Sequence, residues 1–366
     1  MGKRIQSLLS EIQRSYGDTA ARIGPLQRSL QSIPTGSLTL DYELGTGGWP
    51  LGYLVGVYGP RDIGKSSLIG FNAIVNAQNM GLNCGWLAVE PMGDDNWADW
   101  ATKNGVDVDK LLITYPRTGE EAFEMLQMML KSEVIDLVIF DSIGGLLSEV
   151  EMRDSGKPRQ GGQAGLITWG IKMAAPLAFR NNACVILLNQ VRHDMRPGVK
   201  GVVYKQPGGE ALEHFESIIV QLKRGPTKFT IKEDGNEVVV GQEIVCLIER
   251  NKLSEGTRRK AVFNYFHTET DQYPFGIDKL SDIINISKRT GIIVQSGSFF
   301  TMPDGKKLQG KAAVAKHLEE NPELLTILRE SVLEVMLQRR SSGLVIEESD
   351  SEDEDIYISE EESVVV

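Results

Sequence analysis

The sequence predicts an α/β protein whose core is a mostly parallel sheet covered by helices on both faces. Short apolar runs alternate with stretches of helical periodicity between residues 53 and 190, which is the pattern of buried parallel strands joined by helices. A glycine-rich loop, GPRDIGKSS from Gly59 to Ser67, stands between such a strand and such a helix. The length of 366 residues suggests two or three folded units, and a content of 41% hydrophobic and 24% charged residues is that of globular proteins with a sizeable core.

The composition excludes several classes of protein. No apolar run reaches the roughly 18 residues of a membrane-spanning helix, so we expect none. The charged N-terminus lacks the apolar block of a secretory signal, which predicts a protein that stays inside the cell. Cys84, Cys184 and Cys246 stand alone in apolar runs, so we interpret them as buried free thiols rather than metal ligands or disulfides.

Acidic residues are concentrated near the C-terminus. The formal net charge is −11, but ten of the 50 acidic residues lie between Glu347 and Glu362, where there is no lysine or arginine. The rest of the chain is therefore nearly neutral. Residues 341–366 are too charged to fold alone and are expected to form a disordered acidic tail. The tail is either a solubilising extension or an autoinhibitory polyanion that competes with phosphates for basic surfaces.

The remaining elements follow from local patterns. Ile5, Leu8, Leu9 and Ile12 predict an amphipathic N-terminal helix without a local core, which suits docking on another subunit. The runs YLVGVY, CGWLAV, LLITY, DLVIFD and ACVILLN predict the parallel strands, with helices from about residues 65, 95, 120 and 165. After residue 217 the chain is rich in β-forming residues, with a turn at residues 234–236. Residues 278–338 predict a small helical unit that contains a hairpin.

The loop after the first of these strands matches the GxxxxGK(S/T) pattern in its required strand, loop and helix setting. Glycines allow backbone N–H groups to turn towards a polyphosphate, and the following helix adds the positive end of its dipole. Lys65 is expected to reach the β and γ phosphates, and the Ser66 hydroxyl to bind Mg²⁺. The predicted nucleotide-binding residues of the loop are Gly59, Pro60, Arg61, Asp62, Ile63, Gly64, Lys65, Ser66 and Ser67.

Polar residues also follow the neighbouring apolar strands. Asp141 ends IDLVIFD, where it can bind Mg²⁺ beside Ser66, although alone it would be an ordinary helix cap. Glu90 ends CGWLAVE and is expected to orient the water that attacks the γ-phosphate, the alternative being a surface acid or an N-cap. Gln190 follows ACVILLN, where its amide can bond the γ-phosphate of a triphosphate and not a diphosphate. Strand ends of an open parallel sheet line the ligand crevice, so we expect these side chains to meet.

Two segments rich in glycine and basic residues follow this edge of the sheet. They are RDSGKPRQGGQ at residues 153–163 and VRHDMRPGVKGVVYKQPGG at residues 191–209, and the second is expected to form neither strand nor helix. Both are predicted to bind a phosphate backbone, with Tyr204 available to contact a base or a ribose. Composition alone leaves open that they are ordinary surface loops.

These motifs resemble those of the RecA family of strand-exchange recombinases, including its bacteriophage-encoded members. SIPTGSLTLDYELGTGGWPLG, GPRDIGKSS, VIFDSIGGL, LLNQVR and PGGEALEHF occur in the family's order and spacing, and the resemblance extends to about residue 337. It implies an oligomerisation helix and linker at residues 1–32, a RecA-like P-loop core at residues 33–275, and a small α+β domain at residues 276–340 that captures duplex DNA. It also implies DNA-binding loops at about residues 153–163 and 191–207.

The resemblance implies functions for the residues of the nucleotide site. Glu90 would be the catalytic glutamate and Asp141 the aspartate of the Mg²⁺ site. Gln190 would couple the γ-phosphate to the second DNA-binding loop. Asp94 and Trp97 would contact adenine.

Further residues would act outside the chain's own nucleotide site. Arg250 and Lys252 match the basic pair that the family supplies to the nucleotide of the adjacent subunit, where cations stabilise charge on the transferring phosphoryl group. The predicted DNA-binding residues are Arg153, Lys157, Arg159, Lys172, Arg192, Arg196, Lys200, Tyr204, Lys205, Gly208, Gly209, Lys306, Lys307 and Lys311. The last three lysines alternatively form a plain solvated cluster.

Some positions depart from the family's pattern near DNA. Trp169 and Pro176 replace arginines that the family uses there, with Lys172 and Arg180 nearby as substitutes. We therefore expect the DNA contacts to differ in detail from those of the family.

Other departures concern the phosphate loop and the subunit interface. Arg61 replaces an acid within the loop, and Glu213 and His214 stand where the family has a lysine and a phenylalanine. The nucleotide site is complete by motif, and such divergence suits a phage-encoded member.

The activity implied by the resemblance is that of an ATP-dependent DNA recombinase. It would use ATP and Mg²⁺, polymerise on single-stranded DNA as a helical filament, pair it with double-stranded DNA, and act in recombination and in repair of DNA damage. DNA would stimulate its ATP hydrolysis, and single-strand-binding and loading proteins would be further partners in the cytoplasm of a bacterium or of a phage's host. A ring-forming helicase or motor and a non-enzymatic ATP-binding assembly factor are the alternatives, although the leading helix and the acidic tail favour a filament.

Overall fold

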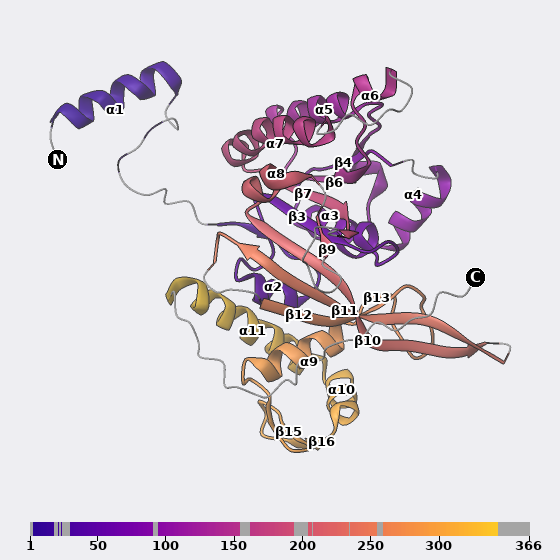
Figure 1. Cartoon of the computed structure of the whole chain (residues 1–366). Helices are drawn as coiled ribbons and strands as arrows, with labels where there is room; N and C mark the ends of the chain where they lie inside the picture. Colours follow the sequence, from indigo (N-terminus) through magenta and orange to yellow (C-terminus); the bar gives the residue numbers. More distant parts are fainter. Residues whose placement is uncertain are drawn as a thin grey trace, which may run out of the picture.

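The central element of the structure is a nine-stranded mixed sheet (Figure 1). The structure is a computed structural model that describes residues 3–17, 21, 23, 30–90, 94–153, 162–193, 204–206, 208–233, 235–254 and 259–342. The strand order is β13-β12-β11-β10-β3-β7-β6-β4-β5, in which the strands from β10 to β5 run parallel and β11, β12 and β13 pair antiparallel. The strands are β3 (Leu54–Gly59), β4 (Cys84–Ala88), β5 (Leu111–Thr114), β6 (Leu137–Asp141), β7 (Cys184–Gln190), β10 (Ile218–Glu233), β11 (Asn236–Asn251), β12 (Arg259–Phe266) and β13 (Gly276–Ile277). The predicted α/β class with a mostly parallel sheet is confirmed.

Helices cover both faces of this sheet. Alternate residues of β7 enter two separate apolar cores: Ile186 and Leu188 lie in one, and Val185 and Leu187 in the other. The first core includes α2 (Leu38–Leu44), the π-helix η1 (Lys65–Phe71), α3 (Asn72–Asn79) and α4 (Asp94–Lys103), and the second includes α5 (Gly119–Lys131), α7 (Gly162–Asn181) and α8 (Gly209–Phe215). Burial on both faces explains why these strands read as continuous apolar runs.

Short elements connect the larger ones. They are β1 (Ser32–Ile33), β2 (Trp49–Pro50), the 3₁₀ turns η2 (Val108–Lys110) and η3 (Ile143–Gly145), α6 (Glu149–Arg153), β8 (Arg192–His193) and β9 (Tyr204–Lys205). The strands β10 and β11 form a long hairpin, and the predicted turn is confirmed because β10 ends at Glu233 and β11 begins at Asn236. In this hairpin the ring of Phe229 packs against the rings of Phe266 and Tyr273, with centroid distances of 4.9 Å and 5.5 Å.

The three cysteines are buried and free, as predicted. Burial raises the pKa of the Cys84 thiol to about 12, so this group stays protonated and inert at neutral pH. Among the residues that the structure describes, no helix has the length and apolar character needed to cross a membrane.

A small C-terminal α+β region packs beside the sheet. It contains α9 (Lys279–Arg289), α10 (Lys311–Glu320), α11 (Pro322–Ser342) and a sheet of β14 (Val294–Ser296), β15 (Phe299–Thr301) and β16 (Lys307–Gln309). Its own apolar core includes Ile283 and Phe300. Asp282 of α9 accepts hydrogen bonds from Ser37 Oγ at 3.1 Å and from the Leu38 N–H at 2.7 Å. A side chain of the C-terminal region thus satisfies donors at the start of α2 that have no partner within that helix.

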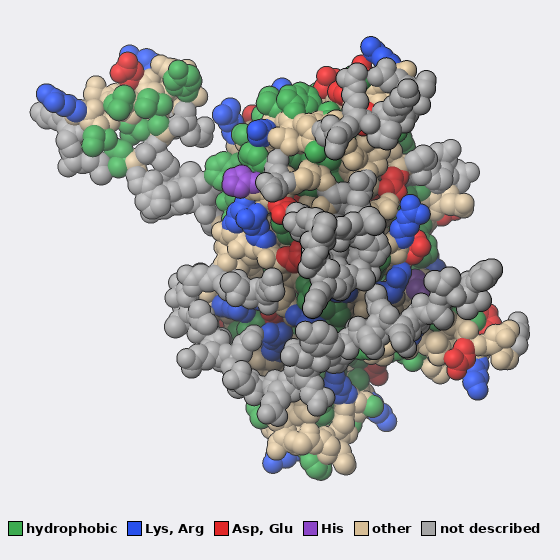
Figure 2. All heavy atoms as spheres, in the orientation of Figure 1, with side chains coloured by type: hydrophobic (Ala, Val, Ile, Leu, Met, Phe, Trp, Pro, Cys, Tyr) green, Lys and Arg blue, Asp and Glu red, His purple; other side chains and the backbone are tan. Residues whose placement is uncertain are grey.

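The N-terminal helix α1 (Lys3–Tyr16) lies apart from the rest of the described chain (Figure 1). Ile5 and Leu8 are 54% and 56% exposed. Figure 2 shows apolar side chains gathered on the face of α1 that is turned to the viewer. The predicted amphipathic helix is confirmed. Its docking on a neighbouring subunit stays a prediction, which the uncovered apolar face supports.

Candidate nucleotide-binding site

The predicted nucleotide-site residues meet where neighbouring parallel strands end. Gly59 ends β3 and is paired in register with Gln190, which ends β7. Asp141 ends β6 and is paired with Ala88, the last residue of β4, two residues before Glu90. Since β3, β7, β6 and β4 are adjacent in this order, the phosphate loop and the three polar residues share one edge of the sheet.

The conformation of the phosphate loop depends on its glycines. Gly64 has a φ of 89°, in the left-handed region that favours glycine. A Cβ atom on Gly59 would lie 3.0 Å from the Cβ atom and the carbonyl oxygen of Leu222 on β10, so β3 ends with little room for a side chain. The predicted helix begins at Lys65, but its first 7 residues form a π-helix before α3 continues. Such π-helical turns are frequent at functional sites.

The ammonium group of Lys65 turns back onto this loop. Its Nζ atom donates to the carbonyl oxygens of Pro60 at 2.7 Å and Gly59 at 3.1 Å. Burial lowers the pKa of Lys65, and the nearby Asp141 and Glu90 oppose this change. A polyphosphate would offer this cation charged oxygens in place of neutral carbonyls, and charge-assisted hydrogen bonds are the stronger kind.

Ser66 and Asp141 form a pair of oxygen donors at the start of η1. The Ser66 hydroxyl donates to Oδ2 of Asp141 at 2.7 Å. Burial raises the pKa of Asp141 to about 6, with the Ser66 hydrogen bond opposing the rise and Glu90 adding to it. A divalent cation would supply the positive charge that favours the ionised carboxylate. A hydroxyl and a carboxylate are ligands that Mg²⁺ prefers, so this pair fits the predicted Mg²⁺ site.

Hydrogen bonds connect Glu90 with the phosphate loop. Oε1 of Glu90 accepts from Ser142 Oγ at 2.5 Å and from Gln190 Nε2 at 3.1 Å. The amide oxygen of Gln190 in turn accepts from Arg61 Nε at 3.3 Å. Sequence reasoning missed Ser142 and the part that Arg61 plays in orienting this amide. The available signals were that Ser142 directly follows Asp141 and that Arg61 lies within the loop itself.

The predicted adenine contacts belong to α4. Trp97 packs edge-to-face on Phe71 and Trp86, with ring centroids 5.5 Å and 5.3 Å away. Its ring is therefore half-buried against the core beside η1. The side chain of Asp94, the first residue of α4, lies outside the described part of the chain. Adenine contacts by these two residues stay a prediction.

The predicted basic pair lies away from the phosphate loop of its own chain. In the sheet register, Arg250 of β11 is paired with Ile219 of β10, which is paired with Gly56 of β3. Gly56 precedes the end of β3 at Gly59 by three residues, which is roughly 10 Å along a strand. Lys252 lies beyond the end of β11, further still from that edge.

Both cations instead bind the last turn of α8. Arg250 Nη1 donates to the carbonyl oxygen of Glu213, and Lys252 Nζ donates to that of His214. Cations suit the carbonyl end of a helix, because its last carbonyl groups carry partial negative charge. The structure does not bring this pair together with Lys65.

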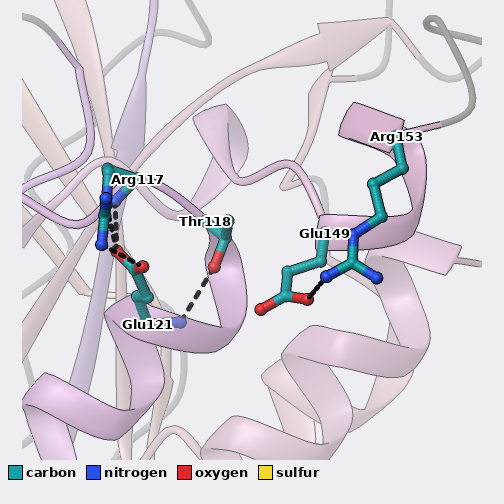
Figure 3. A network of polar contacts seen from close by, with 5 residues as sticks. All are labelled: Arg117, Thr118, Glu121, Glu149 and Arg153. Atoms are coloured by element: carbon teal, nitrogen blue, oxygen red, sulfur yellow. Dashed lines mark hydrogen bonds and ion pairs between the residues drawn. The ribbon is translucent and has the colours of Figure 1, made fainter.

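The first predicted DNA-binding segment begins at the end of α6. Arg153 pairs with Glu149 one turn earlier, with 3.0 Å between Nη2 and Oε2 (Figure 3). Both side chains are exposed, and exposed pairs of this kind contribute little to stability. Figure 3 also shows the start of α5 beside this helix, where Thr118 accepts a hydrogen bond from the backbone as an N-cap. Lys157 and Arg159 are not among the described residues, so DNA binding by this segment stays a prediction.

The second predicted DNA-binding segment contains regular structure, so the expectation that it forms neither strand nor helix is wrong. β8 and β9 pair antiparallel, and α8 begins at Gly209. Beyond the end of β7, β8 and β9 form a two-stranded sheet of their own, which places the two ends of the segment side by side, and no apolar pattern marks that pairing. Gly208 and Gly209 have φ values of 125° and 79° at the entry to α8. The structure does not describe the side chains of Arg192, Tyr204 and Lys205 or any part of Arg196 and Lys200.

Helix α7 carries the residues that depart from the family's pattern near DNA. Trp169 is 45% exposed, with its ring edge-to-face with Phe123 at 6.4 Å. Pro176 lies within the helix. Lys172 and Arg180 are exposed on the same helix, so they are accessible as the predicted substitutes.

The remaining predicted DNA-binding lysines lie in the C-terminal region and are exposed. Lys306 Nζ lies 3.2 Å from Nδ1 of the buried His317, and Lys311 donates to Asn285 Oδ1 at 3.2 Å. Lys307 begins β16. Their contact with duplex DNA stays a prediction.

Comparisons with known proteins cover nearly the whole chain. The profile of the RecA N-terminal domain matches residues 3–270, and that of the RecA C-terminal domain matches residues 281–337. The chain is 31% identical over 365 residues to Protein RecA of Acinetobacter baylyi, with 98% of each chain covered. It is also 31% identical over 359 residues to Protein RecA of Thermus thermophilus, with 96% of this chain and 98% of that protein covered.

Proposed function

The chain belongs to the RecA family, and from that premise we propose that it is an ATP-dependent DNA recombinase. Subunits bound to ATP polymerise on single-stranded DNA, pair it with homologous duplex DNA, and exchange strands during recombination and repair. The observation that carries this proposal is the meeting of Lys65, Asp141, Glu90 and Gln190 at one edge of the sheet, directly before the segment predicted to bind DNA.

The loop and the residues around it would hold the nucleotide. Backbone N–H groups of the phosphate loop and the ammonium group of Lys65 bind the phosphates. Ser66 and Asp141 would hold Mg²⁺, which would supply positive charge to stabilise the phosphoryl group being transferred. The site geometry supports this assignment, because both oxygen donors lie within hydrogen-bond distance of each other at the start of η1.

Glu90 is the group that orients the attacking water and receives its proton. Ser142 and Gln190 both donate to the same carboxylate oxygen, which fixes the direction of the side chain. Such positioning contributes much of the rate in reactions where the protein itself forms no covalent bond.

Gln190 couples nucleotide and DNA. Its Nε2 atom binds Glu90 in this structure, and an oxygen of the γ-phosphate would compete for the same donor. Gln190 ends β7, two residues before β8 begins at Arg192, so a movement of its amide reaches the start of the second DNA-binding segment. Loss of the γ-phosphate reverses the movement and weakens the hold on DNA.

Arg250 and Lys252 serve the nucleotide of the adjacent subunit. Their position near the other end of the parallel strands supports this, because the register keeps them away from their own phosphate loop. Hydrolysis then depends on assembly, since the positive charge that stabilises the transition state arrives from a neighbour.

The test is phosphate release by the full chain with and without single-stranded DNA, followed by strand exchange with homologous and unrelated duplexes. We expect DNA to stimulate hydrolysis, filaments to form with ATP in electron micrographs, and joint molecules to form only with the homologous duplex. Rings that unwind DNA would indicate a motor instead. ATP binding without phosphate release would indicate an assembly factor, and either result would refute the proposal.

A further inference from the structure

A buried carboxyl group outside the nucleotide site connects several elements. Glu216, between α8 and β10, is 0% exposed, and both of its carboxyl oxygens accept a hydrogen bond from Nε2 of Gln206, at 3.0 Å and 2.9 Å. Gln206 directly follows β9, near the end of the second predicted DNA-binding segment, and is itself buried. Glutamate is almost never fully buried without a partner, so this pair is a specific feature of the fold.

Gly56 of β3 provides the space for this carboxyl group. A Cβ atom on Gly56 would lie 2.1 Å from Oε1 and 2.4 Å from Cδ of Glu216. Gly56 is not among the glycines with a positive φ, so the glycine is required for close approach rather than for an unusual backbone conformation. β3 ends three residues later at Gly59, where the phosphate loop begins. Glu216 therefore packs on the strand that carries this loop.

Burial and the groups around Glu216 together determine its charge. The titratable and charged groups that face it are Glu213 on α8, Tyr58 on β3, and Arg250 and Lys252 on the β11 side. Burial raises the pKa of Glu216 to about 8, which Gln206 and the two cations oppose and Glu213 reinforces. The carboxyl group is mainly neutral near pH 7, so its contact with Gln206 depends on packing and hydrogen bonding more than on charge.

One end of the second DNA-binding segment is therefore tied to the nucleotide site, and the other end is tied to the strand that leads into its phosphate loop. Gln190 contacts Glu90 at the start, the pairing of β8 with β9 joins the two ends, and Gln206 contacts Glu216 at the end. We propose that Glu216 is a positioning residue for DNA-dependent ATP hydrolysis: through Gln206 it holds the end of the DNA-binding segment on the strand that leads into the phosphate loop. This inference rests on the function proposed above and adds a second connection to the one through Gln190.

The test compares Glu216→Ala and Glu216→Gln with the wild-type full chain. Glutamine keeps the size of the side chain and an acceptor for Gln206, whereas alanine removes both. For Glu216→Ala, we expect the single-stranded DNA concentration that gives half-maximal hydrolysis to rise about tenfold, the effect of losing one buried hydrogen bond. Hydrolysis without DNA and the affinity for ATP should not change. Glu216→Gln should stay close to wild type.

A second pair of variants tests the contact with β3. Gly56→Ala should produce the same rise, because its Cβ atom displaces the carboxyl group. The double variant Gly56→Ala/Glu216→Ala should be no worse than Glu216→Ala alone, since residues that act through one contact are not additive. The matched control is Glu43→Ala, which removes another buried glutamate, paired with Arg289 at 3.1 Å, and should leave the DNA concentration unchanged.

The outcomes distinguish a positioning role of Glu216 from a general effect on the stability of the protein. An unchanged half-maximal DNA concentration in Glu216→Ala, an equal rise in Glu216→Gln, additive effects in the double variant, or a parallel fall of hydrolysis without DNA would overturn the inference. If Glu216→Ala does not fold, Gln206→Ala removes the donor and carries the same expectations. A wild-type chain whose hydrolysis DNA does not stimulate would contradict the proposed function instead.

Discussion

The two ends of the parallel strands carry different kinds of polar contact. At the carboxyl end the contacts join side chains. Asp141 and Gln190 each accept a hydrogen bond from a side chain of the phosphate loop, and Gln190 donates one to Glu90. Towards the other end, Arg250 and Lys252 bind backbone carbonyl groups of α8. One end thus has the groups that are proposed to hold a nucleotide, while the two cations lie towards the other end of the strands. This division is expected of a head-to-tail assembly in which each nucleotide is completed by the next subunit.

The largest effect is expected at the carboxyl end. Lys65→Ala should lower ATP hydrolysis by about 1,000-fold or more, because it removes a positive charge from the transferring phosphates. Phosphate release measures this effect. The matched control is Lys103→Ala, whose ammonium group lies over the rings of Trp100 and Phe275 rather than in the loop. Normal turnover in Lys65→Ala would refute the site.

Glu90→Gln tests whether ATP binding and ATP hydrolysis depend on different residues at the carboxyl end of the strands. We expect hydrolysis to fall about 100-fold, because the amide cannot accept a proton from water. Binding of ATP and retention of single-stranded DNA should persist, since the loop and the Ser66–Asp141 pair are unchanged. Filter binding beside the phosphate assay measures both quantities, and a joint loss of binding and hydrolysis would contradict the catalytic assignment.

Mixtures of two inactive variants test whether the two ends of the strands act on the same nucleotide from different subunits. Arg250→Ala and Lys65→Ala should each be inactive alone, but an equal mixture should recover about a quarter of wild-type hydrolysis. One subunit then supplies an intact loop and its neighbour supplies the intact cation, as a head-to-tail interface allows. A mixture of Glu90→Gln and Lys65→Ala is the control, because both changes damage the same end. If both mixtures recover hydrolysis equally, or if neither mixture recovers it, the two ends of the strands do not have separate roles in adjacent subunits.

The smallest effect concerns the acid beside the cations. The pKa of Glu216 rises from its ordinary 4.5 to about 8, so the folded state holds the proton more tightly than the unfolded state. This stabilisation is complete below pH 4.5 and is lost as the pH rises through 8, by up to about 1.4 kcal/mol per pH unit. In urea unfolding without nucleotide, wild type should lose stability between about pH 6 and pH 8 more steeply than Glu216→Gln. Parallel curves would contradict this expectation.

The sequence predicts the carboxyl end of the strands better than the surroundings of the cations. Asp141, Glu90 and Gln190 each close an apolar run, and the topology of a parallel sheet then places them at one edge. Glu216 and Gly56 show no such pattern. A glycine within a strand and a glutamate after a helix are ordinary until the fold brings them into contact.

Two other features show the same limit. The pairing of β8 with β9 forms a separate two-stranded sheet between residues distant in the sequence, and its short strands have no apolar alternation. The spacing of Trp97 suits an adenine contact, but spacing alone cannot show that Phe71 and Trp86 already pack against its ring. Motifs tied to strand ends are therefore predictable, whereas contacts between distant segments require the structure.

The bond between Asp282 and α2 limits how the C-terminal region can move. Rotating α9 alone would withdraw its carboxylate from Ser37 and Leu38 and leave the buried Ser37 hydroxyl and the half-buried Leu38 N–H without this acceptor. A swing of this region must therefore take α2 along as one rigid body. Because α2 also packs on β11 and β12, a displacement at the outer surface would be transmitted mechanically to the strand that bears Arg250.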